Sequence, residues 1–210
     1  RAEIDLGAIA HNVKVLRDVA GKAALWAMVK ANAYGHGLVE VGRLLEGESI
    51  AGLGVATVEE GLALRDAGVR SRVLVFGGPY GSAVRDVLAK NLTPVVNHPH
   101  EVAAFAAAAG QGIVAVHIEI DTGMSRLGVS EARVPAMLEA LAAAKNVRVE
   151  GLFTHFASSE VPEEDGFTHE QLRRFIDVVY AFRAQGHAPL LHAANSGGLW
   201  RHPPSRLDMV

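Results

Sequence analysis

AMVKANAYGHG is the sequence of residues 27–37, and the rest of the chain is organised around it. An apolar run, residues 23–29, ends in Lys30, and a turn of small residues that carries Tyr34 and His36 follows. The run predicts a strand that ends in the lysine. Desolvation at such a position disfavours the ammonium form of a lysine, and the neutral amine is the nucleophile that Schiff-base chemistry requires. Taken alone, the position favours an ordinary surface lysine. Whether Lys30 is a nucleophile therefore has to be judged from the rest of the chain.

Strand-like and helix-like stretches alternate from this point onward. The predicted strands are residues 23–30, 50–56, 73–76, 93–96, 113–120, 147–153, 190–193 and 206–210. The predicted helices between them are residues 38–46, 58–66, 82–89, 99–109, 131–144 and 165–185, with a loop at 77–81 and a short helical segment after Asn195. Strict alternation implies parallel strands with right-handed crossovers. Eight units favour an α/β fold of the (β/α)8 TIM-like barrel type.

A doubly wound open sheet is the alternative architecture. It would prefer a glycine-rich fingerprint after its first strand, and Gly35-His36-Gly37 matches that motif poorly.

The first residues form a lead-in to the barrel. Residues 3–6 alternate apolar and acidic side chains and predict a short strand, and Asp5 is placed to cap a helix that Gly21 ends. We therefore divide the chain into an N-terminal strand and helix at residues 1–22 and a barrel at residues 23–210. The chain starts without methionine and stops inside the last predicted strand, so we expect a piece of a longer polypeptide whose barrel is truncated in that strand.

Composition narrows the function classes. The 210 residues are half hydrophobic and carry a formal net charge of −3, which argues weakly against a nucleic-acid partner. The absence of cysteine excludes disulfides and thiolate chemistry and is compatible with a cytoplasmic location. No stretch is long and apolar enough to span a bilayer, and the first residues do not resemble a signal peptide.

Polar side chains gather at the carboxyl ends of the predicted strands, where barrel enzymes have their sites. These residues are Lys30 at the first strand, His117, Glu119 and Asp121 on one face of the fifth, His155 after the sixth, and His192, Asn195 and Ser196 at the seventh. Period-two alternation places the three residues of the fifth strand on one face. The sequence thus predicts that one lysine, several histidines and two carboxylates converge on one mouth.

The segment after the fifth strand, residues 119–128, reads EIDTGMSRLG. Its small residues allow a close backbone approach, and Arg126 offers a rigid donor fork. Glu119 would be costly if buried alone, so we expect it to pair with Arg126. A structural ion pair at the barrel rim is an equally good interpretation.

Residues 195–198 read NSGG and stand between a strand and a short helix. Backbone amides at a helix start, with a hydroxyl, suit a phosphate, although Asn195 or Ser196 could equally be an ordinary helix cap. His155 could act as acid or base, stack on a ring or be a half-buried structural histidine. A metal site from His155, His192 and a carboxylate lacks tight ligand spacing, so we predict none.

A lysine, an anion site and an arginine together suggest a phosphate-bearing aldehyde cofactor held as a Schiff base. Pyridoxal phosphate fits, because it acts as an electron sink for a carbanion.

Four motifs, in order, resemble the alanine racemase family. Residues 29–37, VKANAYGHG, resemble its pyridoxal-phosphate lysine motif, and residues 121–128, DTGMSRLG, are similar to its second motif. Residues 151–157, GLFTHFA, and 192–196, HAANS, are similar to its third and fourth motifs. The first two are specific, and the last two support them. The resemblance covers nearly the whole chain and implies pyridoxal-phosphate-dependent interconversion of L-alanine and D-alanine.

The resemblance implies three catalytic residues: Lys30, Arg126 and His155. Lys30 would form the internal aldimine and then serve as the base on one face of the substrate. Arg126 would contact the phenolic oxygen of the pyridoxal ring, and His155 would lie against that ring.

The resemblance also implies the other cofactor-binding residues. Tyr34 and Ser196 would bind the cofactor phosphate, with Asn195 in the same motif as Ser196. His192 would orient an arginine that holds the pyridine nitrogen. Many family members have a carbamylated lysine at the position of Glu119, so we hypothesise that Glu119 orients Arg126 directly as a supporting residue.

Further implications concern groups outside the 210 residues. In the family the pyridine-nitrogen arginine follows a stretch like residues 207–210, and a tyrosine base on the opposite face comes from a C-terminal β-domain of the partner subunit in a homodimer. We therefore expect this chain alone to be an inefficient racemase, and residues 2–6, which pack with that domain in the family, to be loose. The family also implies D-alanine supply for peptidoglycan and a bacterial source.

Three other functions remain open at this stage. One is a pyridoxal-phosphate-binding barrel without turnover. A second is a related barrel racemase or decarboxylase for larger amino acids. A third is a cofactor-free Schiff-base aldolase, which would leave Tyr34 and Ser196 without their expected roles.

Overall fold

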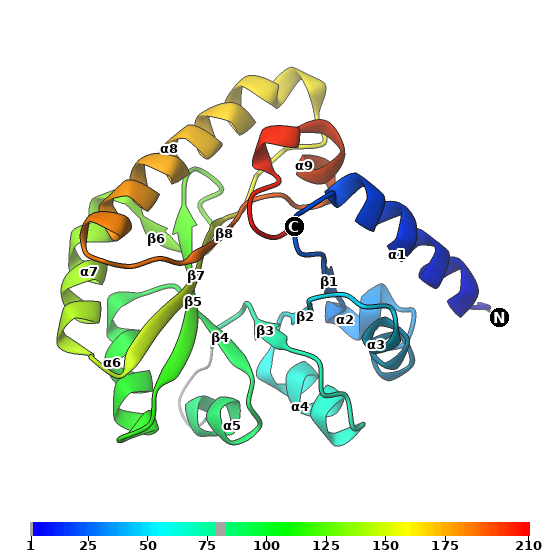
Figure 1. Ribbon diagram of the computed structural model, residues 1–210, viewed down its shortest axis with the longest axis horizontal. Coiled ribbons are helices and arrows are strands. Elements are labelled where there is room, and N and C mark those ends of the chain that lie inside the picture. Colours follow the sequence, from blue (N-terminus) through cyan, green and yellow to red (C-terminus); the bar gives the residue numbers. More distant parts are fainter. Residues whose placement is uncertain (1, 79–82) are drawn as a thin grey trace. The chain divides into compact units, whose positions relative to one another are not determined.

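The computed structural model describes residues 2–78 and 83–210, which form two compact units. The first unit ends at Pro94 and the second begins at Val95, so the boundary falls within one strand, Thr93–Val96. Figure 1 labels the elements of both. The loop predicted at residues 77–81 and the helix start predicted at Ser82 lie in part outside the described residues. The domain boundary predicted at residue 22 stays a prediction.

The first unit alternates parallel strands and helices. Its strands β1 (Trp26–Met28), β2 (Gly52–Val55), β3 (Val73–Val75) and the start of β4 (Thr93–Val96) pair in that order, all parallel. Its helical segments are α1 (Leu6–Ala20), α2 (Lys30–Tyr34), α3 (Leu38–Gly47), α4 (Val58–Asp66) and α5 (Ala83–Ala89). The predicted strands are confirmed, although β1 stops at Met28, before the predicted end at Lys30.

Apolar side chains explain why these strands are central. Leu53, Val55, Val73 and Val75 are completely buried, as expected for parallel strands covered on both faces. Helix α4 begins where it does because the Thr57 hydroxyl accepts from the Glu60 amide while the Glu60 carboxylate accepts from the Thr57 amide, a capping box.

The strand predicted at residues 3–6 is wrong. Residues 2–5 have no regular structure, and α1 begins at Leu6. The predicted cap by Asp5 is confirmed, because its Oδ1 accepts from the Gly7 and Ala8 amides at 2.8 and 3.1 Å. These bonds start the helix within the predicted strand, and four alternating residues without a paired neighbour are too few to resist them.

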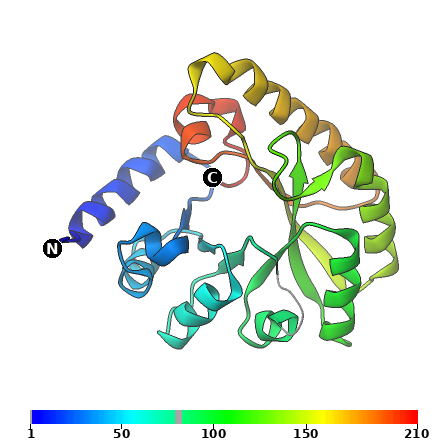
Figure 2. The same cartoon turned by 180° about the vertical axis from the view of Figure 1, so that it is seen from behind.

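The second unit continues the same alternation. The end of β4, β5 (Val114–Asp121), β7 (Val147–Thr154) and β8 (Leu190–His192) pair in parallel, and the two-residue strand β6 (Val129–Ser130) adds to β5. The helices are α6 (Pro99–Ala109), α7 (Val134–Ala143), α8 (Asp165–Ala184) and α9 (Ser196–Arg201). Three short 3₁₀ turns occupy residues 131–133, 162–164 and 203–205. Helices α6, α7 and α8 lie along one face of the strands in both views (Figures 1 and 2).

The strand predicted at residues 206–210 is present only as a single parallel bridge between His192 and Met209. Side-chain and backbone bonds of Asp208 explain this. Its Oδ2 accepts from the Leu191 amide at 2.8 Å, and its own amide donates to the Leu191 carbonyl at 2.9 Å. The segment therefore lies beside the end of β8 without extending the ladder.

Within the part of the chain that the structure describes, no helix combines the length and the apolar character that crossing a membrane requires.

Candidate active site

Lys30 follows Val29, the buried residue that comes directly after β1. Val29 is 1% exposed, and its amide donates to the Gly54 carbonyl of β2 at 2.8 Å. The chain then enters α2, whose backbone is left-handed over most of its length. Ala31, Asn32 and Ala33 have φ of 52°, 57° and 52° with ψ near 50°, and Tyr34 has φ of 54°. Lys30 is thus followed by a complete left-handed turn.

This turn costs free energy, because each non-glycine residue in the left-handed region loses about 1–2 kcal/mol relative to the right-handed one. Part of the compensation is local. Asn32 Oδ1 accepts from the Leu38 amide at 2.8 Å, and the Asn32 carbonyl accepts from the Gly37 amide at 2.9 Å. Backbone strain of this kind persists where the surrounding structure holds it and is concentrated at functional sites. The turn presents the Tyr34 side chain to solvent, 60% exposed.

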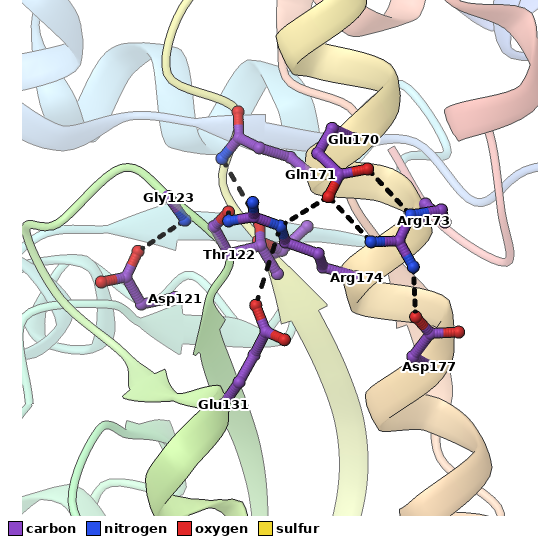
Figure 3. Close-up of polar contacts among 10 residues, drawn as sticks. Asp121, Thr122, Gly123, Glu131, Glu170, Gln171, Arg173, Arg174 and Asp177 are labelled. Atoms are coloured by element: carbon purple, nitrogen blue, oxygen red, sulfur yellow. Dashed lines mark hydrogen bonds and ion pairs between the residues drawn. The ribbon is translucent and has the colours of Figure 1, made fainter.

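The loop after β5 is organised by Asp121. Its Oδ1 accepts from the amides of Gly123 and Ser125 at 3.0 and 2.9 Å, and the first of these bonds is drawn in Figure 3. Ser125 also takes a left-handed backbone, with φ of 57°. Arg126 follows it and is exposed. The predicted loop therefore carries an exposed arginine directly after a tight turn.

Helix α8 supports this loop through Gln171, a residue that the sequence reading missed. Gln171 is completely buried, and its Nε2 donates to the His155 carbonyl at 3.1 Å and to Thr122 Oγ1 at 3.4 Å. Its Oε1 accepts from the Ala157 amide at 3.0 Å. Gln171 thus ties the loop after β5 to the segment after β7. Figure 3 shows Gln171 beside Thr122 of that loop. Its position on the buried face of α8, four residues before Phe175, is the sequence signal that could have found it.

The same helix has a charged outer face. Arg174 donates to Glu170 at 2.9 Å and to the Thr122 carbonyl at 3.4 Å, and its Nε lies 3.9 Å from Glu131 (Figure 3). The Thr122 and Thr154 hydroxyls share a hydrogen bond of 2.6 Å beneath it. The two loops are therefore joined at the ends of β5 and β7.

Glu119 is 4% exposed on β5. Its burial raises the pKa of the carboxyl to about 7, an effect that the positive charge of Arg126 opposes and the nearby Asp121 reinforces. Arg126 therefore acts on Glu119 through space, while no ion pair within 4 Å joins the two in the residues that the structure describes. Direct orientation of Arg126 by Glu119 stays a prediction.

The raised pKa predicts that the contribution of Glu119 to the stability of the chain is lost as pH rises from 5 to 8. Between the ordinary value of 4.5 and about 7, folded Glu119 holds a proton that the unfolded chain has lost. This contribution should fall by about 2 kcal/mol across this range. It is measured as the difference in pH dependence between the wild type and Glu119→Gln, because His192, whose lowered pKa acts with the opposite sign, contributes to both. Urea unfolding at pH 5, 6, 7 and 8 measures it. Glu119→Gln should remove this decline in the free energy of unfolding, whereas exposed Glu139→Gln should keep the pH dependence of the wild type. Equal pH dependence in both variants would contradict the assignment.

His192 lies at the end of β8 and is buried. Its Nε2 is 2.9 Å from Nδ1 of the completely buried His117, and its ring stacks on Phe153 with centroids 4.4 Å apart. Burial, assisted by His117, lowers the pKa of His192 well below its usual value, so the ring stays neutral at pH 7. His117 Nε2 lies 3.8 Å from Glu150. A neutral imidazole in such a chain presents a fixed tautomer to whatever it faces.

The remaining predicted residues follow β7 and β8 as expected. His155 comes directly after β7 and is half-buried. Asn195 caps α9: its Oδ1 accepts from the Gly198 amide at 2.9 Å and from the Ser159 hydroxyl at 2.6 Å. Ser196 is the first residue of that helix. The structure thus assigns the Asn195 side chain a capping role, while its cofactor role stays a prediction.

The two units each contain part of the predicted constellation. Lys30 and Tyr34 belong to the first unit. Arg126, His155, His192, Asn195 and Ser196 belong to the second, together with Glu119. In the described ranges, no cluster of three or more His, Asp or Glu side chains is arranged to hold a metal ion. In the first unit, the amine of Lys30 after a strained turn suits condensation with an aldehyde. In the second unit, the exposed guanidinium of Arg126 suits an anionic oxygen.

Comparison with known proteins places this arrangement in a family. The model of the alanine racemase N-terminal domain matches residues 4–210. Alanine racemase from Sorangium cellulosum is 39% identical over all of the chain, and that from Mycolicibacterium vanbaalenii is 42% identical. The chain spans 58% and 55% of the length of these relatives.

Solved structures agree with the sequence relatives. The alanine racemase of the D-cycloserine producer Streptomyces lavendulae is 33% identical and superposes with a TM-score of 0.94, covering 99% of this chain and 56% of that one. Alanine racemase from Streptomyces coelicolor is 32% identical with a TM-score of 0.94, covering 100% of this chain and 57% of that one. The predicted α/β barrel class is therefore confirmed, and the chain belongs to the alanine racemase N-terminal domain family.

Proposed function

We propose that the protein to which this chain contributes interconverts L-alanine and D-alanine with pyridoxal phosphate. The observation that carries the proposal is Lys30, two residues after β1, followed at once by a left-handed turn. Membership of the alanine racemase N-terminal domain family supports the reaction and the substrate. A homodimer in the cytoplasm is the corresponding expectation for the whole protein.

The residues that would hold the cofactor are those of the four motifs. The Lys30 amine would condense with the cofactor aldehyde, forming a C=N bond and releasing water. Tyr34 and Ser196 would bind the phosphate, Arg126 would donate to the phenolic oxygen, and His155 would lie against the ring. When bound, pyridoxal phosphate supplies an electron sink that stabilises the charge left when the α-proton is removed.

The chain's own residues would then manage protons and orientation. Lys30 Nζ would take the α-proton on one face and return a proton to that face. Neutral His192, held at 2.9 Å by His117, would accept a hydrogen bond from the arginine that holds the pyridine nitrogen. Racemisation also needs a base on the opposite face. We infer that this base comes from outside the 210 residues, so this chain alone should turn over poorly.

The test is a racemase assay on the full-length protein in deuterium oxide. We expect L-alanine to give D-alanine with deuterium at the α-carbon, and D-alanine to give the L form likewise. The 210-residue chain, purified separately, should capture pyridoxal phosphate with a visible absorbance band while racemising far more slowly.

The competing functions give different results in the same assay. A band without any α-proton exchange in the full-length protein would indicate a binding barrel without turnover. Exchange with lysine or arginine but not alanine would indicate a racemase for larger amino acids, and carbon dioxide release would indicate a decarboxylase. Turnover of a substrate by protein that shows no visible absorbance band and receives no added cofactor would favour the cofactor-free Schiff-base aldolase.

A further inference from the structure

Glu60 makes a contact that its role as a helix cap does not require. Its Oε2 accepts from the Ala56 and Thr57 amides at 2.8 and 3.2 Å, which is the capping arrangement at the start of α4. Its Oε1 accepts instead from the Ala31 amide at 2.6 Å, 29 residues earlier in the chain. One half-buried carboxylate thus joins α4 to the residue that follows Lys30.

Ala31 is where the backbone leaves ordinary geometry. It is the first of the four residues with positive φ, so its amide direction decides how the left-handed turn begins. Alanine has no side-chain hydrogen bond with which to favour this conformation, and its methyl group is unfavourable in it. A short hydrogen bond to a carboxylate is among the stronger contacts available to an amide. Glu60 therefore stabilises the turn at its first strained residue.

We propose that Glu60 is a positioning residue for Lys30, acting through the Ala31 amide. The functional part of this inference rests on the proposed role of Lys30 in holding pyridoxal phosphate. Glu60 bonds the backbone next to Lys30 and so fixes the direction in which the lysine leaves β1. Only an ionised carboxylate can serve all three amides, because a glutamine would present its NH₂ group to at least one N–H.

The chain offers a matched control for the capping role. Thr57 Oγ1 accepts from the Glu60 amide at 3.3 Å in the same capping box. Thr57→Ala therefore weakens the start of α4 and leaves the bond between Glu60 and Ala31 in place. Glu60→Gln weakens that bond even where the glutamine oxygen faces the Ala31 amide, because the acceptor is no longer charged. If Glu60 served only to cap α4, Glu60→Gln and Thr57→Ala would differ from each other in stability alone.

The first measurement is amide hydrogen exchange at residues 31–37 in the cofactor-free chain. We expect Ala31 to exchange at least about tenfold faster in Glu60→Gln than in the wild type, the effect of losing a hydrogen bond to a charged group. Thr57→Ala should leave this rate near that of the wild type. Unchanged exchange at Ala31 in Glu60→Gln, with the variant folded by circular dichroism, overturns the inference.

The second measurement is the reactivity of Lys30. Pulses of acetic anhydride and of pyridoxal phosphate followed by borohydride, each mapped by peptide mass spectrometry, report the rate of modification at Nζ. We expect Glu60→Gln to change the acetylation rate of Lys30 relative to exposed Lys22 and to slow cofactor capture about tenfold, with Thr57→Ala near wild type. Equal Lys30 reactivity in wild type and Glu60→Gln overturns the inference.

These readouts separate the two proposals. If the wild-type chain and the full-length protein never capture pyridoxal phosphate at Lys30, the proposed function fails. Exchange at Ala31 and acetylation of Lys30 still decide whether Glu60 positions this lysine.

Discussion

Lys30→Ala is expected to abolish covalent capture of pyridoxal phosphate. The Nζ of Lys30 is the amine carried at the entrance to the left-handed turn, and alanine removes it without disturbing the backbone bonds of the turn. The variant should show no visible absorbance band, and borohydride should fix no cofactor onto residues 27–37. In the full-length protein, α-proton exchange should fall to background. Spectra before and after borohydride, with peptide mapping, make the measurement.

Two variants make this result specific. Lys30→Arg keeps the positive charge but offers a guanidinium, which does not form a Schiff base, so it should behave like Lys30→Ala. Exposed Lys22→Ala in the same unit should match the wild type. A borohydride-stable band of normal intensity in Lys30→Ala would show that another amine holds the cofactor, and the proposed function would lose its principal support.

Gly151→Ala is expected to destabilise the chain by about 3 kcal/mol or more, at the upper end of the cost of overpacking. Gly151 of β7 pairs with His117 of β5. A Cβ at this glycine would clash with His117 Nδ1 and lie 2.6 Å from its Cγ. The ring has no room to retreat, because it is completely buried and bonded to His192 at 2.9 Å. Urea unfolding of the wild type and the variant measures the loss.

A second glycine provides the control with the opposite sign. Gly166 lies in the first turn of α8, and a Cβ there would meet nothing within 4 Å. Gly166→Ala should therefore stabilise the chain by about 0.5–1 kcal/mol, since alanine is the better helix former. Adding His117→Ala to Gly151→Ala should recover part of the lost stability, because the clashing ring is removed. A free energy of unfolding unchanged by Gly151→Ala would contradict the packing of His117 against β7.

Much of the fold follows from local pattern in the sequence. Apolar runs such as those ending at Val55 and Val75 become completely buried parallel strands, and Asp5 caps α1 as its residue type predicts. The two failures occur at the ends of the barrel pattern. Residues 3–6 lack a paired strand, and residues 206–210 touch β8 through one bridge only. Periodicity indicates which face a strand would present, but pairing decides whether a strand forms.

The candidate site divides in the same way. The places of Lys30, Arg126, His155 and His192 at or soon after strands follow from the sequence, because strand order is written along the chain, while their roles stay predictions. The left-handed turn after Lys30 does not follow, because alanine and asparagine prefer other conformations and only contacts such as that between Ala31 and Glu60 hold them there. Gln171 and the contact between His117 and His192 were also missed. These contacts join residues that are 16 to 75 positions apart in the chain. Sequence spacing does not predict them, because only the packing of the chain brings these residues together.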